Sequence, residues 1–289
     1  MKVRITTGLS AGLLALAGLI WIETPLVLCL VVGFSVIAAH EICHAVQMKN
    51  RAMIAVSMAM AALLPPVLAY WPAISGRLHI PALLLLLGYL LLLLALMLAQ
   101  FDKTRCSHVL YALLASLLVP GALAAIPMLR GFAPEKNLAV WLLLFTLCGA
   151  WVTDIFALFV GVKFGRHKLA PHISPKKTVE GAVGGLVGCV LMNLGFALLF
   201  NRFFLEQHKI NLLGVALLSL AAGVVSMMGD LAASVLKRNH GVKDFGKIFP
   251  GHGGVMDRFD SLVLVTPFVY ALLQLQQNLG LPILFGPAL

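Results

Sequence analysis

Charged residues are scarce in this sequence, and their scarcity argues against a soluble fold. Only 11% of the 289 residues are Asp, Glu, Lys or Arg, whereas 61% are hydrophobic. A soluble domain of this length carries about a quarter charged residues to cover its surface. Apolar stretches such as LLLLLGYLLLLLALMLA at 83–99 are long enough to cross a bilayer. The composition therefore predicts a polytopic membrane protein.

Cysteine is also sparse. The five cysteines stand singly in or beside apolar runs, and no CxxC pair occurs. This distribution argues against a disulfide framework and against a thiolate metal site. We expect the cysteines to be small core residues.

Hydropathy predicts an all-α polytopic membrane fold with about nine transmembrane helices. The first could be taken for a signal peptide, because MKVR precedes it, but the many spans that follow favour a retained helix. We expect an N-terminal transmembrane scaffold of about five helices (1–137) and a C-terminal catalytic domain of about four (138–289), with polar loops at 163–180 and 234–260. The expected spans are 5–22, 26–46, 52–71, 79–100, 107–128, 138–162, 180–200, 211–233 and 261–285.

The basic residues predict the orientation. With the N-terminus in the cytoplasm, about three quarters of the 21 Lys and Arg residues fall on the cytoplasmic side. We therefore expect a multi-pass protein of the cell inner membrane, with the N-terminus and the active site cytoplasmic and the C-terminus outside. Topology and an anionic partner on the cytoplasmic face account for the net charge of +10, so no nucleic acid is needed to explain it.

Polar chemistry gathers in two long segments, 163–181 and 237–261, and most acidic residues of the C-terminal half lie in or beside them. A carboxylate at membrane depth is costly, so Asp154, inside a predicted span, should have a partner. Asp230, Ser234 and Lys237 share a helix face at i, i+4 and i+7, with Arg238 beside them.

Between two predicted helices runs the sequence FPGHGG at 249–254. Its proline and glycines exclude regular helix and let the backbone approach a ligand, so its N–H groups are expected to bind phosphate oxygens. Carboxylates with few imidazoles select Mg²⁺ over Zn²⁺. Together with basic residues at the membrane surface, they predict an enzyme of phosphoryl or nucleotidyl transfer acting on a lipid.

The second polar segment resembles the signature of phosphatidate cytidylyltransferases, also called CDP-diacylglycerol synthases. The upstream pair Gly229–Asp230 and the stretch at 169–181 are also similar to family segments, whereas the stretch after Asp154 lacks the family's small pair and Tyr. The matching signature residues are Ser234, Lys237, Arg238, Lys243, Asp244, Gly246, Pro250, Gly251, His252, Gly253, Gly254, Asp257, Arg258 and Asp260.

The resemblance implies transfer of CMP from CTP to phosphatidate, giving CDP-diacylglycerol and pyrophosphate for phospholipid biosynthesis. Substrate charge must be neutralised, so we expect one or two divalent cations, Mg²⁺ foremost, with a monovalent cation as a further candidate. Asp230 and Asp257 are the first choices as metal ligands, and Asp244 and Asp260 the second. The expected partners are CTP, phosphatidate and the bilayer, and a homodimer is a candidate assembly.

The remaining residues receive provisional roles. His252 is expected to donate to the departing pyrophosphate, or else to stabilise the loop. The catalytic candidates are Asp230, Asp257, His252, Lys237 and Asp244, and the further site candidates are Asp154, Glu180, Ser234 and Glu41. Glycines at 181, 184, 185 and 188 predict close helix packing. The phosphate-binding candidates are Arg238, Lys243, Arg258, Gly251, Gly253, Gly254, Ser174, Lys176, Lys177 and Thr178; for 174–178 the alternative is topology alone.

HEICH at 40–44 has the spacing of the HExxH zinc signature. An intramembrane zinc protease would need a third ligand, and Asp102 lacks the framing of one, so we interpret Glu41 as a wall residue of the lipid site. A transporter would not need two long basic loops on one side. A CTP-dependent lipid kinase is the nearest chemical alternative, distinguished by transfer of the γ-phosphate.

Overall fold

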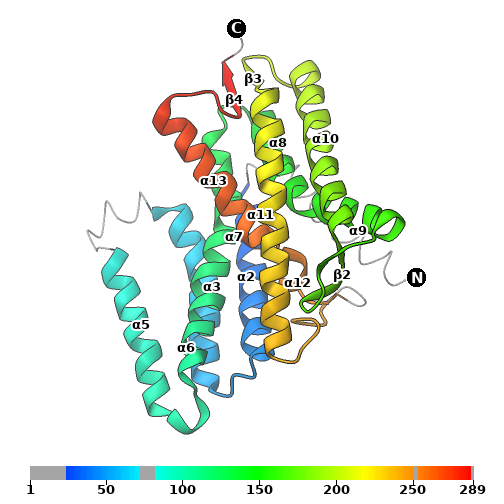
Figure 1. Ribbon diagram of the computed structural model, residues 1–289. Coiled ribbons are helices and arrows are strands. Elements are labelled where there is room, and N and C mark those ends of the chain that lie inside the picture. The colour runs from blue at the N-terminus through cyan, green and yellow to red at the C-terminus, as the bar shows by residue number, and fades with distance from the viewer. Residues whose placement is uncertain (1–23, 72–81, 250–252, 288–289) are drawn as a thin grey trace. The chain divides into compact units, whose positions relative to one another are not determined.

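The computed structural model describes residues 24–71, 82–249 and 253–287 (Figure 1). It confirms an all-α membrane protein, with eight membrane-spanning helices in this part of the chain. The predicted span at 5–22 lies outside the described residues, and each of the other eight predicted spans is present. The eight are Leu26–Ala45, Arg51–Ala69, Ala82–Ala99, Cys106–Phe132, Lys136–Phe164, Val179–Phe203, Leu212–Asn239 and Leu262–Leu279.

Two spans are interrupted by π-helical turns. The fourth consists of α6, a π turn, α7 and the short 3₁₀ helix Leu129–Phe132, and the fifth consists of α8, a π turn and α9. Such turns often mark functional positions. The second π turn is followed directly by α9, whose second residue is Asp154. The bounds are Cys106–Leu113 for α6, Leu114–Leu118 for its π turn, Val119–Met128 for α7, Lys136–Leu147 for α8, Cys148–Val152 for its π turn and Thr153–Phe164 for α9.

The last predicted span, 261–285, is too long. Helix α13 (Leu262–Leu279) ends at Gly280, which takes a left-handed conformation with φ of 64°. That conformation suits a glycine at a helix C-terminus. The chain then forms β4 (Phe285–Pro287), which pairs antiparallel with β3 (His208–Ile210).

Contacts divide the described chain into two units. The first comprises Pro25–Pro127 and Asn239–Arg258, and thus α2 (Leu26–Ala45), α3 (Arg51–Ala69), α5 (Ala82–Ala99), α6, α7 and most of the glycine-rich segment. The second comprises Met128–Arg238 and 259–287. The segment 239–258, assigned from sequence to the C-terminal domain, therefore packs with the N-terminal helices.

In the first unit, the side chain of Asn50 makes three hydrogen bonds. Its side chain caps α3 by accepting from the Met53 N–H at 3.0 Å. It also donates to the Leu96 carbonyl and to the Thr104 hydroxyl, both at 3.0 Å. These bonds connect the start of α3 with α5 and with the turn before α6. In the orientation that we predict, this end of the helices is cytoplasmic.

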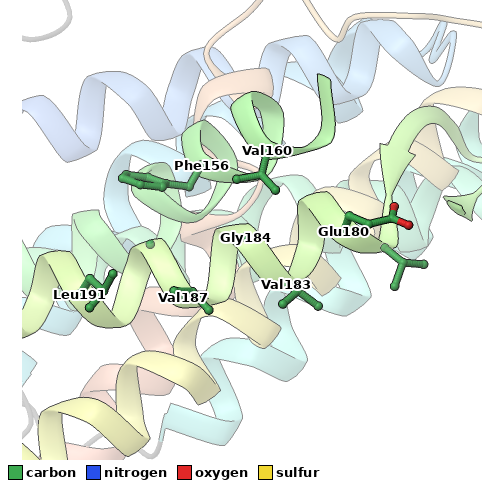
Figure 2. Close-up of a pocket in the computed structure, with 9 residues that line it drawn as sticks. Phe156, Val160, Glu180, Val183, Gly184, Val187 and Leu191 are labelled. Carbon is green, nitrogen blue, oxygen red and sulfur yellow. The ribbon is translucent and has the colours of Figure 1, made fainter. Parts of the chain in front are cut away.

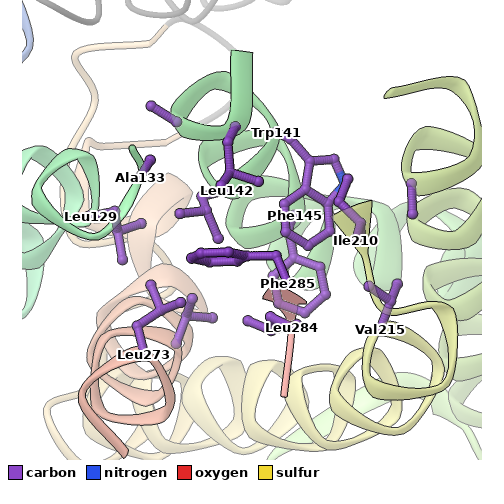
Figure 3. Packing of buried hydrophobic residues seen from close by; sticks show 14 of the residues in the cluster. Leu129, Ala133, Trp141, Leu142, Phe145, Ile210, Val215, Leu273, Leu284 and Phe285 are labelled. Carbon is purple, nitrogen blue, oxygen red and sulfur yellow. The ribbon is translucent and has the colours of Figure 1, made fainter. Parts of the chain in front are cut away.

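The core of the second unit is aromatic and aliphatic (Figure 3). Trp141 and Phe145 of α8 pack with ring centroids 5.5 Å apart, beside Leu273 of α13 and Phe285 of β4. Because lipid tails are as apolar as these side chains, the core is stabilised by close van der Waals packing rather than by removal from water. Pairing of β3 with β4 thus closes the end of the core.

Helices α9 and α10 (Val179–Phe203) approach closely along a row of glycines. A Cβ on Gly184 would lie 2.5 Å from Val160, and one on Gly181 would lie 2.6 Å from the Ala157 carbonyl oxygen. The predicted packing role of these glycines is confirmed. The contact fixes Asp154 of α9 relative to the segment that leads into α10.

Candidate functional site

The glycine-rich segment folds around the carboxylate of Asp257. Its Oδ2 accepts from the N–H of Phe245 at 2.8 Å and from the N–H of Gly254 at 2.9 Å. Phe249 N–H donates to the Gly253 carbonyl at 2.9 Å, and Gly253 has a φ of +83°. A Cβ on Gly253 would also lie 2.8 Å from that Oδ2. Asp257 therefore organises the loop that precedes it.

A second carboxylate enters the same turn from α2. Glu41 Oε1 accepts from the N–H of Val255 at 3.0 Å, and Oε2 accepts from the N–H of Met256 at 2.8 Å. The side chain is buried, with 3% exposure. Sequence reasoning assigned Glu41 to a lipid-pocket wall and missed this contact.

These bonds change the expected role of the loop backbone. The N–H groups of Gly254, Val255 and Met256 donate to protein carboxylates, so they are not the phosphate-binding donors that the sequence predicted. The prediction that Asp257 binds a metal stays a prediction, and its second function, holding the loop, is visible.

The second unit contains its own group of acidic and basic side chains. The ammonium of Lys177 forms an ion pair with Asp230 Oδ2 and lies 4.0 Å from Asp154 Oδ1. Ser261 Oγ donates to Asp154 Oδ2 at 3.4 Å. Asp154, from the π-interrupted helix, thus has the partners that its cost at membrane depth predicted.

Asp260 lies beside this group, 8% exposed. Its Oδ1 accepts from the N–H of Ser261 at 2.8 Å. Burial, followed by the nearby Asp230 carboxylate, raises the pKa of Asp260 to about 8. A cation bound beside Asp260 would lower its pKa again. We call Asp154, Lys177, Asp230, Asp260 and Ser261 the acidic cluster.

Gly229 explains how helix α11 (Leu212–Asn239) reaches the turn at 260. A Cβ on Gly229 would lie 2.8 Å from the Asp260 carbonyl oxygen and 3.1 Å from Ser261 Cα. Glycine therefore permits the helix to contact main chain, and the next residue, Asp230, faces the acidic cluster. This close approach explains why a glycine precedes Asp230 in the sequence.

The hairpin of β1 (Lys168–Ala170) and β2 (Ser174–Thr178) supplies Lys177. Thr178 ends the hairpin and caps α10, accepting from the Gly181 N–H at 3.1 Å. Glu180 accepts from the N–H of Arg166 at 3.0 Å and contacts His167. Thr178 and Glu180 therefore have structural partners in the loop, whereas Ser174 is partly buried and Lys176 is exposed.

The remaining predicted residues differ in exposure. Lys237 and Ser234 are buried, on the helix face that also carries Asp230. Arg238 Nε donates to the Ile173 carbonyl at 3.4 Å, so the hairpin lies against the end of α11. The exposed predicted residues are Arg238, Lys243, Asp244 and Arg258. Pro250, Gly251 and His252 lie outside the described residues.

The donor atoms of the acidic cluster determine which metal ion would fit it. Within the described ranges, no three His, Cys, Asp or Glu side chains converge ready to hold an ion. In the acidic cluster, however, an ammonium already stands between two carboxylates, and three buried or half-buried aspartates supply hard oxygen donors. Such donors suit Mg²⁺ rather than Zn²⁺. The cluster fits a hard cation by chemistry, with Lys177 as its competitor.

The zinc interpretation of HEICH is not supported by the helix. His40 and His44 are exposed and stack with ring centroids 6.3 Å apart, whereas Glu41 is buried. Among the described residues neither histidine joins a metal-binding set. The spacing is a coincidence of an amphipathic helix end.

An apolar groove of about 490 Å³ is lined by residues of α9 and α10 (Figure 2). Its walls are aliphatic and aromatic, and the only charged lining residue is Glu180, at one end. Because the lining residues include no Lys, Arg or His, the groove offers no cation for a phosphate. The lining residues are Phe156, Val160, Val179, Glu180, Val183, Gly184, Val187, Gly188 and Leu191.

Comparison with known proteins identifies relatives. A model of the cytidylyltransferase family matches residues 2–276. A phosphatidate cytidylyltransferase of Thermotoga maritima is 36% identical over 53% of this chain and 54% of its own length. Those of Bacillus subtilis (46% over 43% and 44%) and Rickettsia bellii (34% over 60% and 74%) are also similar. The match spans about half the length of most of these curated relatives.

Proposed function

The chain belongs to the cytidylyltransferase family, and we propose that it transfers CMP from CTP to phosphatidate, releasing pyrophosphate. The observation that carries this proposal is the signature segment itself. The N–H groups of its described part donate hydrogen bonds to two carboxylates, Asp257 and Glu41. In the second unit, Asp230 and Lys177 of the acidic cluster come from the two other segments that resemble the family.

The chemistry requires charge neutralisation more than a base. A phosphate oxygen of the lipid attacks the α-phosphorus of CTP, a new P–O bond forms, and the bond to the β-phosphate oxygen breaks to release pyrophosphate. The attacking oxygen is ionised at neutral pH, so no side chain need remove a proton. Two polyanions must approach, so positioned cations supply the main stabilisation.

Side chains of the described chain are suited to this task. Lys177 and Lys237 are held at the acidic cluster, and we assign them to the phosphates. Lys243 and Arg258 are exposed on the glycine-rich segment and could bind the triphosphate. A hard divalent cation would be held by Asp230, with Asp260 and Asp154 beside it, and would supply further charge stabilisation when bound.

We assign the protein to the cell inner membrane with the acidic cluster on the cytoplasmic side. This rests on the distribution of basic residues, which are concentrated in the two polar segments that carry Lys177, Lys237 and Lys247. CTP is a cytoplasmic solute, and a phosphatidate headgroup reaches the same surface while its acyl chains remain in the bilayer.

The proposal is tested with purified protein in vesicles that contain phosphatidate. Addition of CTP and Mg²⁺ should give a CDP-lipid and an equal amount of pyrophosphate. EDTA should stop the reaction and excess Mg²⁺ should restore it. Asp230→Asn is the matched inactive control. No CDP-lipid from folded wild-type protein would refute the assignment.

A further inference from the structure

Among the described residues of the N-terminal helices, Glu41 is the one carboxylate that is buried against the glycine-rich segment. We infer that it is a positioning residue for the transfer reaction: it fixes the turn at 254–257 and thereby the orientation of Asp257. The inference rests on the proposed function. It assigns Glu41 a role distinct from a zinc-protease base and from a lipid-pocket wall.

The first support is the pattern of hydrogen bonds. Each oxygen of Glu41 accepts from a different consecutive N–H, that of Val255 at 3.0 Å and that of Met256 at 2.8 Å. Val255 and Met256 are 1% and 6% exposed, so water cannot readily replace the carboxylate. A buried N–H left without an acceptor is strongly unfavourable, so loss of Glu41 would force the turn to rearrange.

The second support is steric and independent. A Cβ on Gly246 or on Gly254 would overlap the Glu41 carboxyl group. Two glycines eight positions apart therefore leave the space that this one side chain fills. The segment is shaped to receive Glu41, which a chance contact would not require.

The third support links Glu41 to Asp257. Gly254 donates its N–H to Asp257, and the next two N–H groups donate to Glu41. Three consecutive donors are thus divided between two carboxylates. If Glu41 no longer accepts from the N–H groups of Val255 and Met256, the same short turn can no longer hold Asp257 in its present orientation.

The test compares Glu41→Gln with His44→Ala, a change three residues along the same helix at an exposed position. Gln keeps the shape, but its amide N–H₂ faces one of the two backbone donors. We expect kcat for CDP-lipid formation to fall about tenfold or more. The KM for CTP should stay within about twofold, since Glu41 touches no phosphate in this scheme. His44→Ala should match the wild type.

Two outcomes would overturn the inference. One is wild-type kcat in Glu41→Gln. The other is a lower thermal midpoint with unchanged kcat per folded molecule, which would indicate a role in stability alone. If the wild type itself makes no CDP-lipid, the proposed function fails instead, and the two failures are distinguished.

A second pair of variants guards against misfolding of Glu41→Gln. Gly246→Ala should lower kcat in the wild type, because its methyl group meets the Glu41 carboxylate. In a Glu41→Ala background the same methyl has room, so Gly246→Ala should add little further loss. Equal losses in both backgrounds would show that the glycine and Glu41 act independently and would contradict the inference.

Discussion

Gly229 allows a stringent test of the way the acidic cluster is built. Replacing it with Ala puts a methyl group 2.8 Å from the Asp260 carbonyl oxygen and 3.1 Å from Ser261 Cα. Both are main-chain atoms, so the clash cannot be relieved by a side-chain rotation. Overpacking of this kind costs about 1–3 kcal/mol, and the backbone at 260 must shift.

The opposing term is helix propensity. Ala is favoured over Gly in a helix by about 0.5–1 kcal/mol, so the net destabilisation should be about 1 kcal/mol and at most about 2.5 kcal/mol. Gly195→Ala in α10 is the matched control, because a Cβ there has no neighbour within 4 Å. It gains the propensity term without the clash and should be neutral or slightly stabilising.

The assay is thermal unfolding in detergent together with CDP-lipid formation. Gly229→Ala should lower the unfolding midpoint by a few degrees and reduce turnover about tenfold or more, because Asp260 moves relative to Asp230. Gly195→Ala should keep both values. If Gly229→Ala is as stable and active as Gly195→Ala, the close approach of α11 to the turn at 260 is not needed, and the reasoning is refuted.

Three further predictions concern single side chains. Asp257→Ala should abolish turnover in the labelled-CTP assay, since it removes both the loop acceptor and the predicted metal ligand; normal activity would remove it from the site. Lys177→Ala should lower turnover about tenfold or more, because the cation between Asp154 and Asp230 is lost, with partial recovery in Lys177→Arg; wild-type rates would contradict this. His44→Ala should leave activity intact, and metal analysis of the wild type should find no bound zinc; zinc in the wild type that disappears together with activity in His44→Ala would revive the zinc-protease interpretation.

Hydropathy was sufficient to predict the membrane architecture, because a span needs only about 20 apolar residues. The eight spans on described residues follow from it. The end of α13 was misjudged because Gly280 and the pairing of β4 with β3 stop a helix that the apolar sequence would have extended. The packing role of Gly184 was predictable, since its spacing is a local pattern.

The partners of site residues were harder to predict. Lys177 was expected to bind phosphate, but its pairing with Asp230 depends on a hairpin meeting a helix 53 positions later in the chain. The contact of Glu41 with Val255 spans 214 positions. A signal was present in the sequence, because a carboxylate within an apolar helix needs a partner, but nothing local identifies which partner.

The most direct test of the central claim follows the two ends of CTP. Vesicles with phosphatidate and wild-type protein would receive CTP labelled at the α-phosphate in one sample and at the γ-phosphate in another. Cytidylyl transfer predicts that the α label enters the lipid while the γ label leaves with pyrophosphate. Recovery of the γ label in the lipid would instead establish a CTP-dependent lipid kinase and contradict the account.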